Sequence, residues 1–178
     1  MKFLIRSRLR IGKLCFPFLV SPWQTQTMKF IADVMLGRLA KRMRLLGTDV
    51  LYDRTLDDNE IIRLSLEQDR VILTRDRALS DRPLAANNLL IKSDLVQLQV
   101  EQVLSTFPLE SKLNPFSRCS GCNEPLDRIT REEARDLVPR YVYENKDLFL
   151  RCPRCNRTYW HGTHVRRMAL PGTKDQIK

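Results

Sequence analysis

The stretch KFIADVMLGRLAKRMRLLGTDVLY, residues 29–52, combines two strand signals with a helical pattern between them. Residues 29–32 favour a strand, a helical pattern then runs from Asp33 until Gly47 ends it, and residues 49–52 favour a second strand. The helical pattern has an apolar stripe about 100° wide and a basic opposite side. We expect the helix to pack through Met35, Leu36, Leu39, Met43 and Leu46 and to expose Arg38, Lys41 and Arg44, with Arg42 at the border of the stripe.

The same alternation continues along the chain. It predicts helices over 58–68 and 95–107 and strands over 71–74 and 88–91. Parallel strands need crossover connections, so strands that alternate with helices predict a parallel sheet with helices on its faces. We therefore predict an α/β domain over residues 28–112, with a linker around 107–116.

Acidic residues follow three of the predicted strands. Asp33, Asp58 and Asp76 all fall where a strand gives way to a helix, and in open α/β sheets ligands bind at this edge. Oxygen ligands suit Mg²⁺ or Mn²⁺, which assist hydrolysis of phosphodiesters. The other reading is that Asp33, Asp57 or Asp58 only begins a helix, since aspartate is a favoured N-cap. Asp53 and Asp81 are expected to be solvated loop residues.

Basic residues accompany these aspartates. Arg38, Lys41 and Arg42 lie on the helix that follows Asp33, and Arg75 and Arg77 flank Asp76. They are placed to bind the phosphates of a nucleic acid. A solvated helix face is the other reading for the first three, and ion pairs with the carboxylates are the other reading for Arg75 and Arg77.

Four of the five cysteines form two CxxC pairs, which are the most specific motif of the chain. Cys119 and Cys122 are separated by 29 residues from Cys152 and Cys155, a pattern typical of tetrahedral Zn²⁺ sites. Four thiolates close the coordination sphere, so the zinc is expected to be structural. Free thiols or two disulfides are the alternative.

The cysteines define a second module over residues 117–168. Thr130 and Glu133 form a capping box for a helix over 131–137, and strands are expected over 141–143 and 148–150. Near the end of the module, Tyr159 and Trp160 can either stack on RNA bases or form a small core, and His161 and His164 are expected to be structural.

The net charge of +10 is unevenly distributed. Residues 28–116 carry thirteen basic and thirteen acidic groups, residues 117–178 carry thirteen basic and eight acidic, and residues 1–27 carry five basic groups and none acidic. We expect 1–27 to be an extension outside the fold, with a targeting arm as the alternative, and 169–178 to be a tail. No apolar run is long enough to span a membrane, so we expect a soluble protein without a membrane partner.

Three stretches in order along the chain carry a family resemblance: FIADVMLGRLAKRMRLLGTDV (30–50), DDNEIIRLSLEQDRVILTRDRAL (57–79) and, after the two CxxC pairs, TYWHGTHVRRM (158–168). They resemble the Mut-7 C-terminal RNase domain family. The resemblance implies a PIN-like fold with a zinc ribbon and a metal-dependent ribonuclease site at Asp33, Asp58 and Asp76. Ser65 stands where the family pattern leads us to expect alanine.

Two functions are compatible with these features. The first is a ribonuclease that binds Mg²⁺ or Mn²⁺ through the aspartates, with a structural Zn²⁺ and RNA as its partner. The second is a non-catalytic RNA-binding or ribonucleoprotein adaptor that uses the zinc ribbon. Thiolate zinc ligands favour a reducing compartment, so the expected location is the cytoplasm.

Overall fold

The computed structural model of the protein describes residues 28–109 and 112–161. The extension 1–27, His164 and the tail 169–178 lie outside the described residues, and the expectations for them stay predictions. Within the described ranges, no helix is both long and apolar enough to cross a bilayer.

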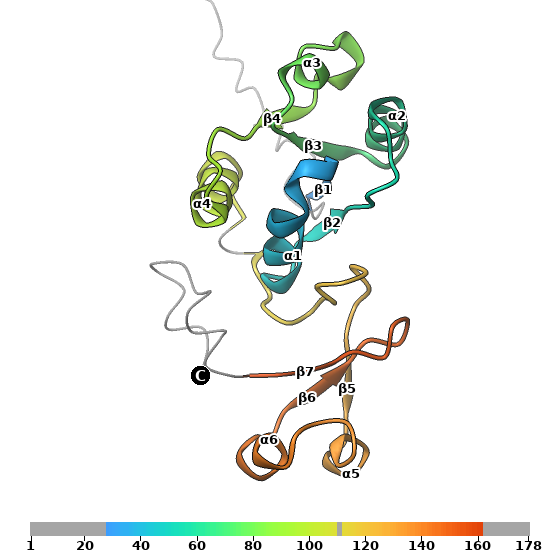
Figure 1. Cartoon of the computed structure of the whole chain (residues 1–178), viewed down its shortest axis with the longest axis vertical. Coiled ribbons are helices and arrows are strands. Elements are labelled where there is room, and N and C mark those ends of the chain that lie inside the picture. Colours follow the sequence, from blue (N-terminus) through green and yellow to red (C-terminus); the bar gives the residue numbers. More distant parts are fainter. Residues whose placement is uncertain (1–27, 110–111, 162–178) are drawn as a thin grey trace, which may run out of the picture.

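The first sheet has four parallel strands in the order β2-β1-β3-β4 (Figure 1). The strands are β1 (Lys29–Ala32), β2 (Asp49–Leu51), β3 (Arg70–Thr74) and β4 (Asn88–Leu90). The helical segments between and after them are η2 (Val34–Leu36), α1 (Gly37–Leu45), α2 (Asp58–Gln68), α3 (Arg77–Ser80), η3 (Pro83–Ala85) and α4 (Val96–Thr106). The predicted α/β class with a parallel sheet flanked by helices is confirmed.

Helices cover both faces of this sheet. Phe30 belongs to an apolar cluster that includes Leu39 of α1 and Val103 of α4, whereas the next residue, Ile31, belongs to a cluster with Ile61 of α2 (Figure 1). Successive side chains of a strand point to opposite faces, so the alternation places α1 and α4 on one side and α2 and α3 on the other. The central strands β1 and β3 are therefore buried on both faces, which fixes the carboxyl ends of both strands.

The first helix differs from its prediction in two side chains. Met35 is 62% exposed rather than packed, and Arg44 is 2% exposed rather than solvated. Residues 34–36 form the 3₁₀ turn η2, in which three residues make a turn, so Met35 is rotated off the apolar stripe. Arg44 is covered by the second module, whose Gly121 carbonyl accepts a hydrogen bond from Nη1 at 2.7 Å.

The second module is a three-stranded antiparallel sheet with two short helices. The strands β5 (Asp127–Ile129), β6 (Phe149–Arg151) and β7 (Thr158–Trp160) pair in that order, and the helices are α5 (Arg131–Ala134) and α6 (Arg140–Asn145). The capping box of Thr130 and Glu133 is present, but α5 is shorter than the predicted 131–137. The four-cysteine module with a small sheet is consistent with the predicted zinc ribbon.

The strand predicted over 141–143 is wrong, because these residues lie in α6. Their aromatic and β-branched side chains favour a strand, but local contacts favour the helix. The Pro139 carbonyl accepts hydrogen bonds from the amides of Val142 and Tyr143, and Arg140 pairs with Glu144 one turn later at 2.7 Å.

The segment predicted to be a linker packs closely against the first domain. The Phe116 amide donates to the Leu45 carbonyl at 3.0 Å, and Leu109 is buried. Gly47 has a φ of +90°, and a Cβ on it would come within 2.1 Å of the Asn114 carbonyl oxygen. Glycine is therefore required here both for the backbone conformation and for the close approach of the segment.

Candidate active site and metal centre

Asp33 stands directly after β1 and is only 4% exposed. Its Oδ1 accepts a hydrogen bond from the Met35 amide at 2.7 Å, which makes Asp33 the N-cap of η2. Its Oδ2 accepts one from the Thr74 hydroxyl at 2.6 Å and a longer one from the Arg75 amide at 3.4 Å. The carboxylate is thus buried and fixed in orientation at the carboxyl edge of the sheet.

Thr74 links Asp33 to Asp76. This last residue of β3 donates its hydroxyl to Asp33, and the same Oγ1 accepts a hydrogen bond from the Asp76 amide at 2.9 Å. The exposed carboxylate of Asp76 caps α3 by accepting from the Ala78 amide at 2.8 Å. Sequence reasoning missed this role of Thr74, although a buried hydroxyl residue at a strand end, next to a conspicuous aspartate, is the signal that would have indicated it.

Asp58 is the first residue of α2 and forms an ion pair with Arg82 at 3.0 Å. It does not cap the helix, because its neighbour Asp57 does so in a reciprocal capping box with Glu60. The capping interpretation therefore applies to Asp57 as well as to Asp33, whereas the Asp58 side chain is half-exposed and caps no helix. Asp53 holds a turn by accepting from the amide and hydroxyl of Thr55.

The three predicted aspartates do not converge as the cysteines do. In the described part of the chain, the four cysteines are the one group of three or more histidine, cysteine, aspartate or glutamate side chains that lie close enough to hold a single ion. Asp33 and Asp76 are joined through Thr74, while Asp58 is held by Arg82. Joint metal binding by the three carboxylates stays a prediction.

The cations near the aspartates behave differently from one another. Arg75 forms an ion pair with Asp94, a carboxylate outside the predicted site. Its Nε is buried without a hydrogen-bond partner among the described residues. Among the described residues, Arg77 forms no ion pair, and neither do Asp33 and Asp76. A buried carboxylate without a cationic partner is costly. The edge at Asp33 is therefore chemically suited to a hard divalent cation.

Arg38 and Lys41 are exposed and line a pocket of about 390 Å³ beside η2. The remaining lining residues are Val34, Met35, Gly37, Tyr52 and Arg54. Arg42 is half-buried and does not line the pocket. The predicted basic face is thus divided along the helix, with Arg38 and Lys41 at the pocket and Arg44 buried in the last turn of α1.

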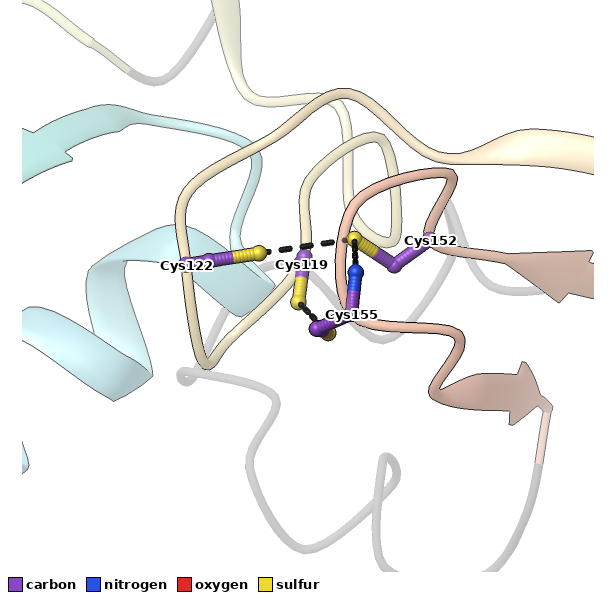
Figure 2. Close-up of side chains that lie close together, drawn as sticks. All are labelled: Cys119, Cys122, Cys152 and Cys155. Atoms are coloured by element: carbon purple, nitrogen blue, oxygen red, sulfur yellow. Dashed lines mark hydrogen bonds between the residues drawn. The ribbon is translucent and has the colours of Figure 1, made fainter.

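The four cysteines form a compact group at the end of two loops (Figure 2). Their ligand atoms lie within 4.8 Å of one another, with Cys119 and Cys155 sulfurs 3.5 Å apart and Cys122 and Cys152 sulfurs 3.4 Å apart. Sulfurs bound tetrahedrally at about 2.3 Å from an ion lie roughly 3.8 Å apart, so a single Zn²⁺ fits with small shifts. No disulfide joins any two of these four cysteines.

The two CxxC loops have the same local geometry. In each, the residue after the second cysteine is an asparagine in the left-handed region, Asn123 at a φ of 68° and Asn156 at 60°. Each asparagine amide donates back to the carbonyl of the first cysteine, Cys119 or Cys152, at 3.0 and 2.9 Å. Asparagine tolerates this conformation better than most residues. Two identical turns thus aim all four sulfurs at one point.

The thiols have strongly divergent pKa values. Burial opposes ionisation of Cys119, but hydrogen bonds from Tyr159 and from the Cys122 and Gly121 amides outweigh it and lower the pKa to about 6. Burial, together with the neighbouring thiols, raises the pKa of Cys122 to about 12. Four thiolates cannot coexist here without a cation, and a bound Zn²⁺ would supply the required charge.

Aromatic residues after the second CxxC support this centre. The Tyr159 hydroxyl lies 3.1 Å from the Cys119 sulfur and accepts from the Ser120 amide at 3.1 Å, and Trp160 packs on the small apolar core of the module. The His161 ring packs on Phe116, and burial lowers its pKa. Of the two interpretations given to Tyr159 and Trp160, the structural one describes what these side chains contact.

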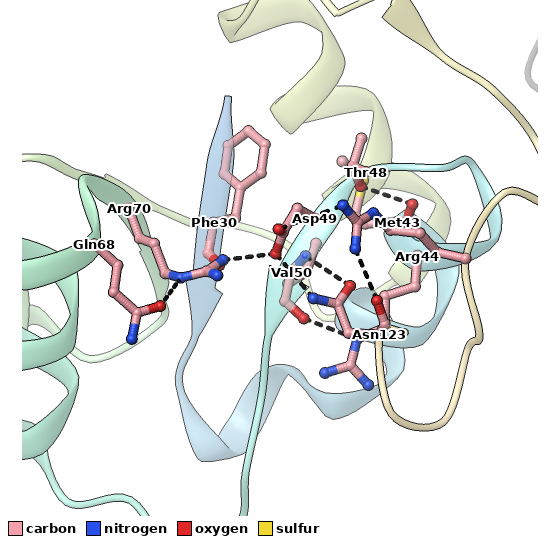
Figure 3. A network of polar contacts seen from close by, with 10 residues as sticks. Phe30, Met43, Arg44, Thr48, Asp49, Val50, Gln68, Arg70 and Asn123 are labelled. Atoms are coloured by element: carbon pink, nitrogen blue, oxygen red, sulfur yellow. Dashed lines mark hydrogen bonds and ion pairs between the residues drawn. The ribbon is translucent and has the colours of Figure 1, made fainter. Parts of the chain in front are cut away.

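A polar network joins the cysteine module to the parallel sheet (Figure 3). Arg44 donates to the carbonyls of Val50, Ser120 and Gly121 at 2.8, 3.3 and 2.7 Å. Asp49 accepts from Asn123 at 2.8 Å and from Arg70 at 2.7 Å. Burial alone would raise the pKa of Asp49, but these hydrogen bonds hold it below its usual value.

Sequence reasoning missed this network, because no spacing rule connects residues 44 and 49 with residues 120–123. Arg118 adds an ion pair to Asp49 at 3.5 Å, and the Val50 amide donates to the Asn123 side chain at 3.1 Å. The first cysteine loop is therefore bonded directly to the end of α1 and the start of β2.

Comparisons with known proteins identify one match. A family model described as Mut7-C RNAse domain matches residues 28–170. No curated protein and no solved structure matches the chain. The match covers both the parallel sheet and the cysteine module, so the two parts form one family unit.

Proposed function

Because the chain belongs to the Mut7-C RNAse domain family, we propose that it is a divalent-metal-dependent ribonuclease that hydrolyses RNA phosphodiesters at the carboxyl edge of the parallel sheet. Asp33, Asp58 and Asp76 are the proposed ligands of catalytic Mg²⁺ or Mn²⁺. The observation that carries the proposal is Asp33: a buried carboxylate, fixed by hydrogen bonds from Met35 and Thr74, for which the described residues provide no cationic partner.

Each residue of the edge has a separate task in this proposal. A bound divalent ion supplies an activated water and charge stabilisation at the leaving oxygen. Asp33 provides a rigid ligand, because each of its oxygens is already oriented by a hydrogen bond. Thr74 sets the backbone of Asp76 relative to Asp33. Asp58 joins only when the ion pair with Arg82 opens.

The basic residues bind the RNA backbone in this proposal. Arg38, Lys41 and Arg42 follow Asp33 along η2 and α1, and Arg77 follows Asp76 on α3, so phosphates on either side of the scissile bond meet positive charge. Arg75 positions the loop rather than the substrate, since its guanidinium pairs with Asp94.

The cysteine module holds a structural Zn²⁺ in this proposal. All four positions of a tetrahedral ion are occupied by Cys119, Cys122, Cys152 and Cys155, which leaves no position for substrate. Cysteines that bind metal rather than form disulfides are typical of a reducing compartment, so we infer the cytoplasm as the site of action.

A second candidate is a non-catalytic RNA-binding adaptor. One observation favours it: the thiols are gathered around a point, whereas the carboxylates are not. An adaptor would bind RNA through its basic surface and would show no cleavage when Mn²⁺ is added.

Metal titration with purified full-length chain separates the two candidates. Zinc-loaded protein is mixed with single-stranded and structured RNAs while Mn²⁺ or Mg²⁺ is increased from zero. We expect Mn²⁺-stimulated cleavage that falls on the order of 100-fold in Asp33→Asn and in Asp76→Asn, because each substitution removes a charged ligand.

Asp136→Asn is the matched control, since Asp136 is exposed on the cysteine module and loses the same charge. Full metal-dependent cleavage by Asp76→Asn would refute the assignment of the site. RNA binding without any metal-stimulated cleavage would favour the adaptor.

A further inference from the structure

The pocket beside η2 has an apolar wall that the side chains of residues 28–109 and 112–161 leave exposed. Met35 is 62% exposed and Val34 is 45% exposed, although both are large hydrophobic residues in an ordered turn. They follow Asp33 directly, and the Met35 amide is the group that binds Asp33 Oδ1. Asp33 itself does not line the pocket, so an occupant would contact the two residues that follow the proposed metal ligand in the chain.

Tyr52 lines the pocket in a fixed position. Its hydroxyl donates to the Val34 carbonyl at 3.2 Å, and its ring lies against Gly37. A Cβ at residue 37 would come within 2.5 Å of the Tyr52 hydroxyl oxygen, so only glycine admits the ring here. Because the ring is already held, a ligand can contact it without ordering it first.

Three cations line the same pocket. Arg38, Lys41 and Arg54 form no ion pair in the described part of the chain, and no carboxylate is among the lining residues. The adjacent Asp53 is turned to the amide and hydroxyl of Thr55. The pocket thus combines three uncompensated positive charges with an apolar and aromatic wall.

We propose that this pocket binds one unpaired nucleotide of single-stranded RNA, with the base against Met35 and Tyr52 and the flanking phosphates on Arg38, Lys41 and Arg54. The volume of about 390 Å³ lies within the range of roughly 300–1,000 Å³ typical of small-ligand sites. Proteins that grip single strands pair basic side chains with surfaces on which bases stack.

This inference rests on the proposed function, because it identifies the substrate of the same edge as single-stranded. In a duplex the bases are stacked on each other and paired, so they cannot enter the pocket. A nucleotide held here would contact Val34 and Met35, the two residues that directly follow Asp33 in the chain.

Binding measurements test the pocket without requiring cleavage. Fluorescence anisotropy follows a labelled 12-nucleotide single-stranded RNA and the same sequence as a duplex, with zinc-loaded full-length protein and no added Mg²⁺ or Mn²⁺. We expect Arg54→Ala and Met35→Ala each to weaken single-strand binding by about tenfold. Both side chains are exposed, so the fold should persist, and circular dichroism checks it.

The two variants are expected to differ in their salt dependence. Each phosphate contact on a single strand contributes about 0.7 to the slope of log K against log salt, so Arg54→Ala lowers the slope by about that amount. Met35→Ala leaves the slope unchanged and leaves duplex binding unchanged, because it removes only base contact. Lys92→Ala, at an exposed position outside the pocket, is the matched control for loss of one positive charge.

The inference would be overturned if Arg54→Ala and Met35→Ala bound single-stranded RNA as tightly as the parent protein. It would also be overturned if Met35→Ala lost as much affinity for the duplex as for the single strand. Competition by polyglutamate as strong as by unlabelled RNA would overturn it in favour of an acidic polypeptide. The proposed function fails separately: these binding effects without any metal-dependent cleavage refute the nuclease and retain the pocket. Asp76-dependent cleavage with unchanged binding refutes the pocket alone.

Discussion

The four-cysteine group and the carboxylate edge are two candidate ligand sets whose members come from distant parts of the chain, but their degree of assembly differs. The four sulfurs lie within 4.8 Å of one another. At the carboxylate edge, Asp33 and Asp76 are instead bound to the amides of Met35 and Ala78, and Asp58 is bound to Arg82.

The difference follows from local chemistry. Each cysteine pair is set by its own turn, with an asparagine in the left-handed region, so two short loops suffice to aim four sulfurs. Thiols also make weak hydrogen bonds, and few groups compete for them. Carboxylates accept strong hydrogen bonds from nearby helix amides, so the fold satisfies each aspartate separately. The turns alone thus assemble the thiol group, whereas the proposed hard-ion site at the sheet edge would be completed by the ion and its substrate.

The largest expected effect is the loss of zinc. Cys152→Ser removes one of four ligands, and structural zinc contributes roughly 10–16 kcal/mol of apparent binding free energy in small domains. We expect the variant to lose stoichiometric zinc and the protection of β6 amides against hydrogen exchange, while β1 and β3 stay protected. Zinc content and hydrogen exchange by mass spectrometry are the measurements.

Cys15→Ser is the control for this experiment, because Cys15 belongs to neither CxxC pair. It should retain one zinc per chain. A Cys152→Ser protein with full zinc and normal protection of β6 would show that the centre is not needed for the fold of the module.

The sequence predicted the elements whose signals are local. The βαβ pattern and the CxxC spacing correspond to the parallel sheet and the four-thiol group, because periodicity and short motifs depend on neighbours along the chain. The helix at 140–145 escaped prediction, since its residues favour strands and contacts around Pro139 and Arg140 decide its conformation.

The candidate site could be predicted only in part for the same reason. The position of Asp33 and Asp76 at the same edge of the sheet followed from the alternation. The pairing of β1 with β3, which puts the hydroxyl of Thr74 between them, did not. The burial of Arg44 depends on a loop 76 residues away. Contacts of this kind are absent from any local pattern.

The junction between the two regions gives the next largest effect. Arg44→Met removes donors from the carbonyls of Val50, Ser120 and Gly121 in a buried environment, so we expect a loss of about 3 kcal/mol in the free energy of unfolding. Urea denaturation monitored by circular dichroism measures it. Hydrogen exchange should also report weaker protection of the first cysteine loop.

Arg42→Met, two residues earlier on α1, is the matched control. Arg42 is half-buried, and its side chain makes no hydrogen bond or ion pair within the described ranges, so the expected change is about 0.5 kcal/mol or less. If Arg42→Met and Arg44→Met destabilised the protein equally, the carbonyl contacts of Arg44 would not be what docks the zinc module on α1.

The smallest expected effect on stability lies at the carboxylate edge and is the most informative for function. Thr74→Val keeps the shape of the side chain but removes the hydroxyl between Asp33 and the Asp76 amide, at a cost of about 1–2 kcal/mol. The cleavage rate per folded molecule should fall by about tenfold, because Asp33 loses its orientation.

Thr48→Val is the matched control. The buried Thr48 hydroxyl donates to the Met43 carbonyl at 2.7 Å at the opposite edge of the sheet. Its loss should cost similar stability without changing the cleavage rate per folded molecule. Equal cleavage by the two variants at equal folded concentration would mean that the Asp33–Thr74–Asp76 link serves the fold alone.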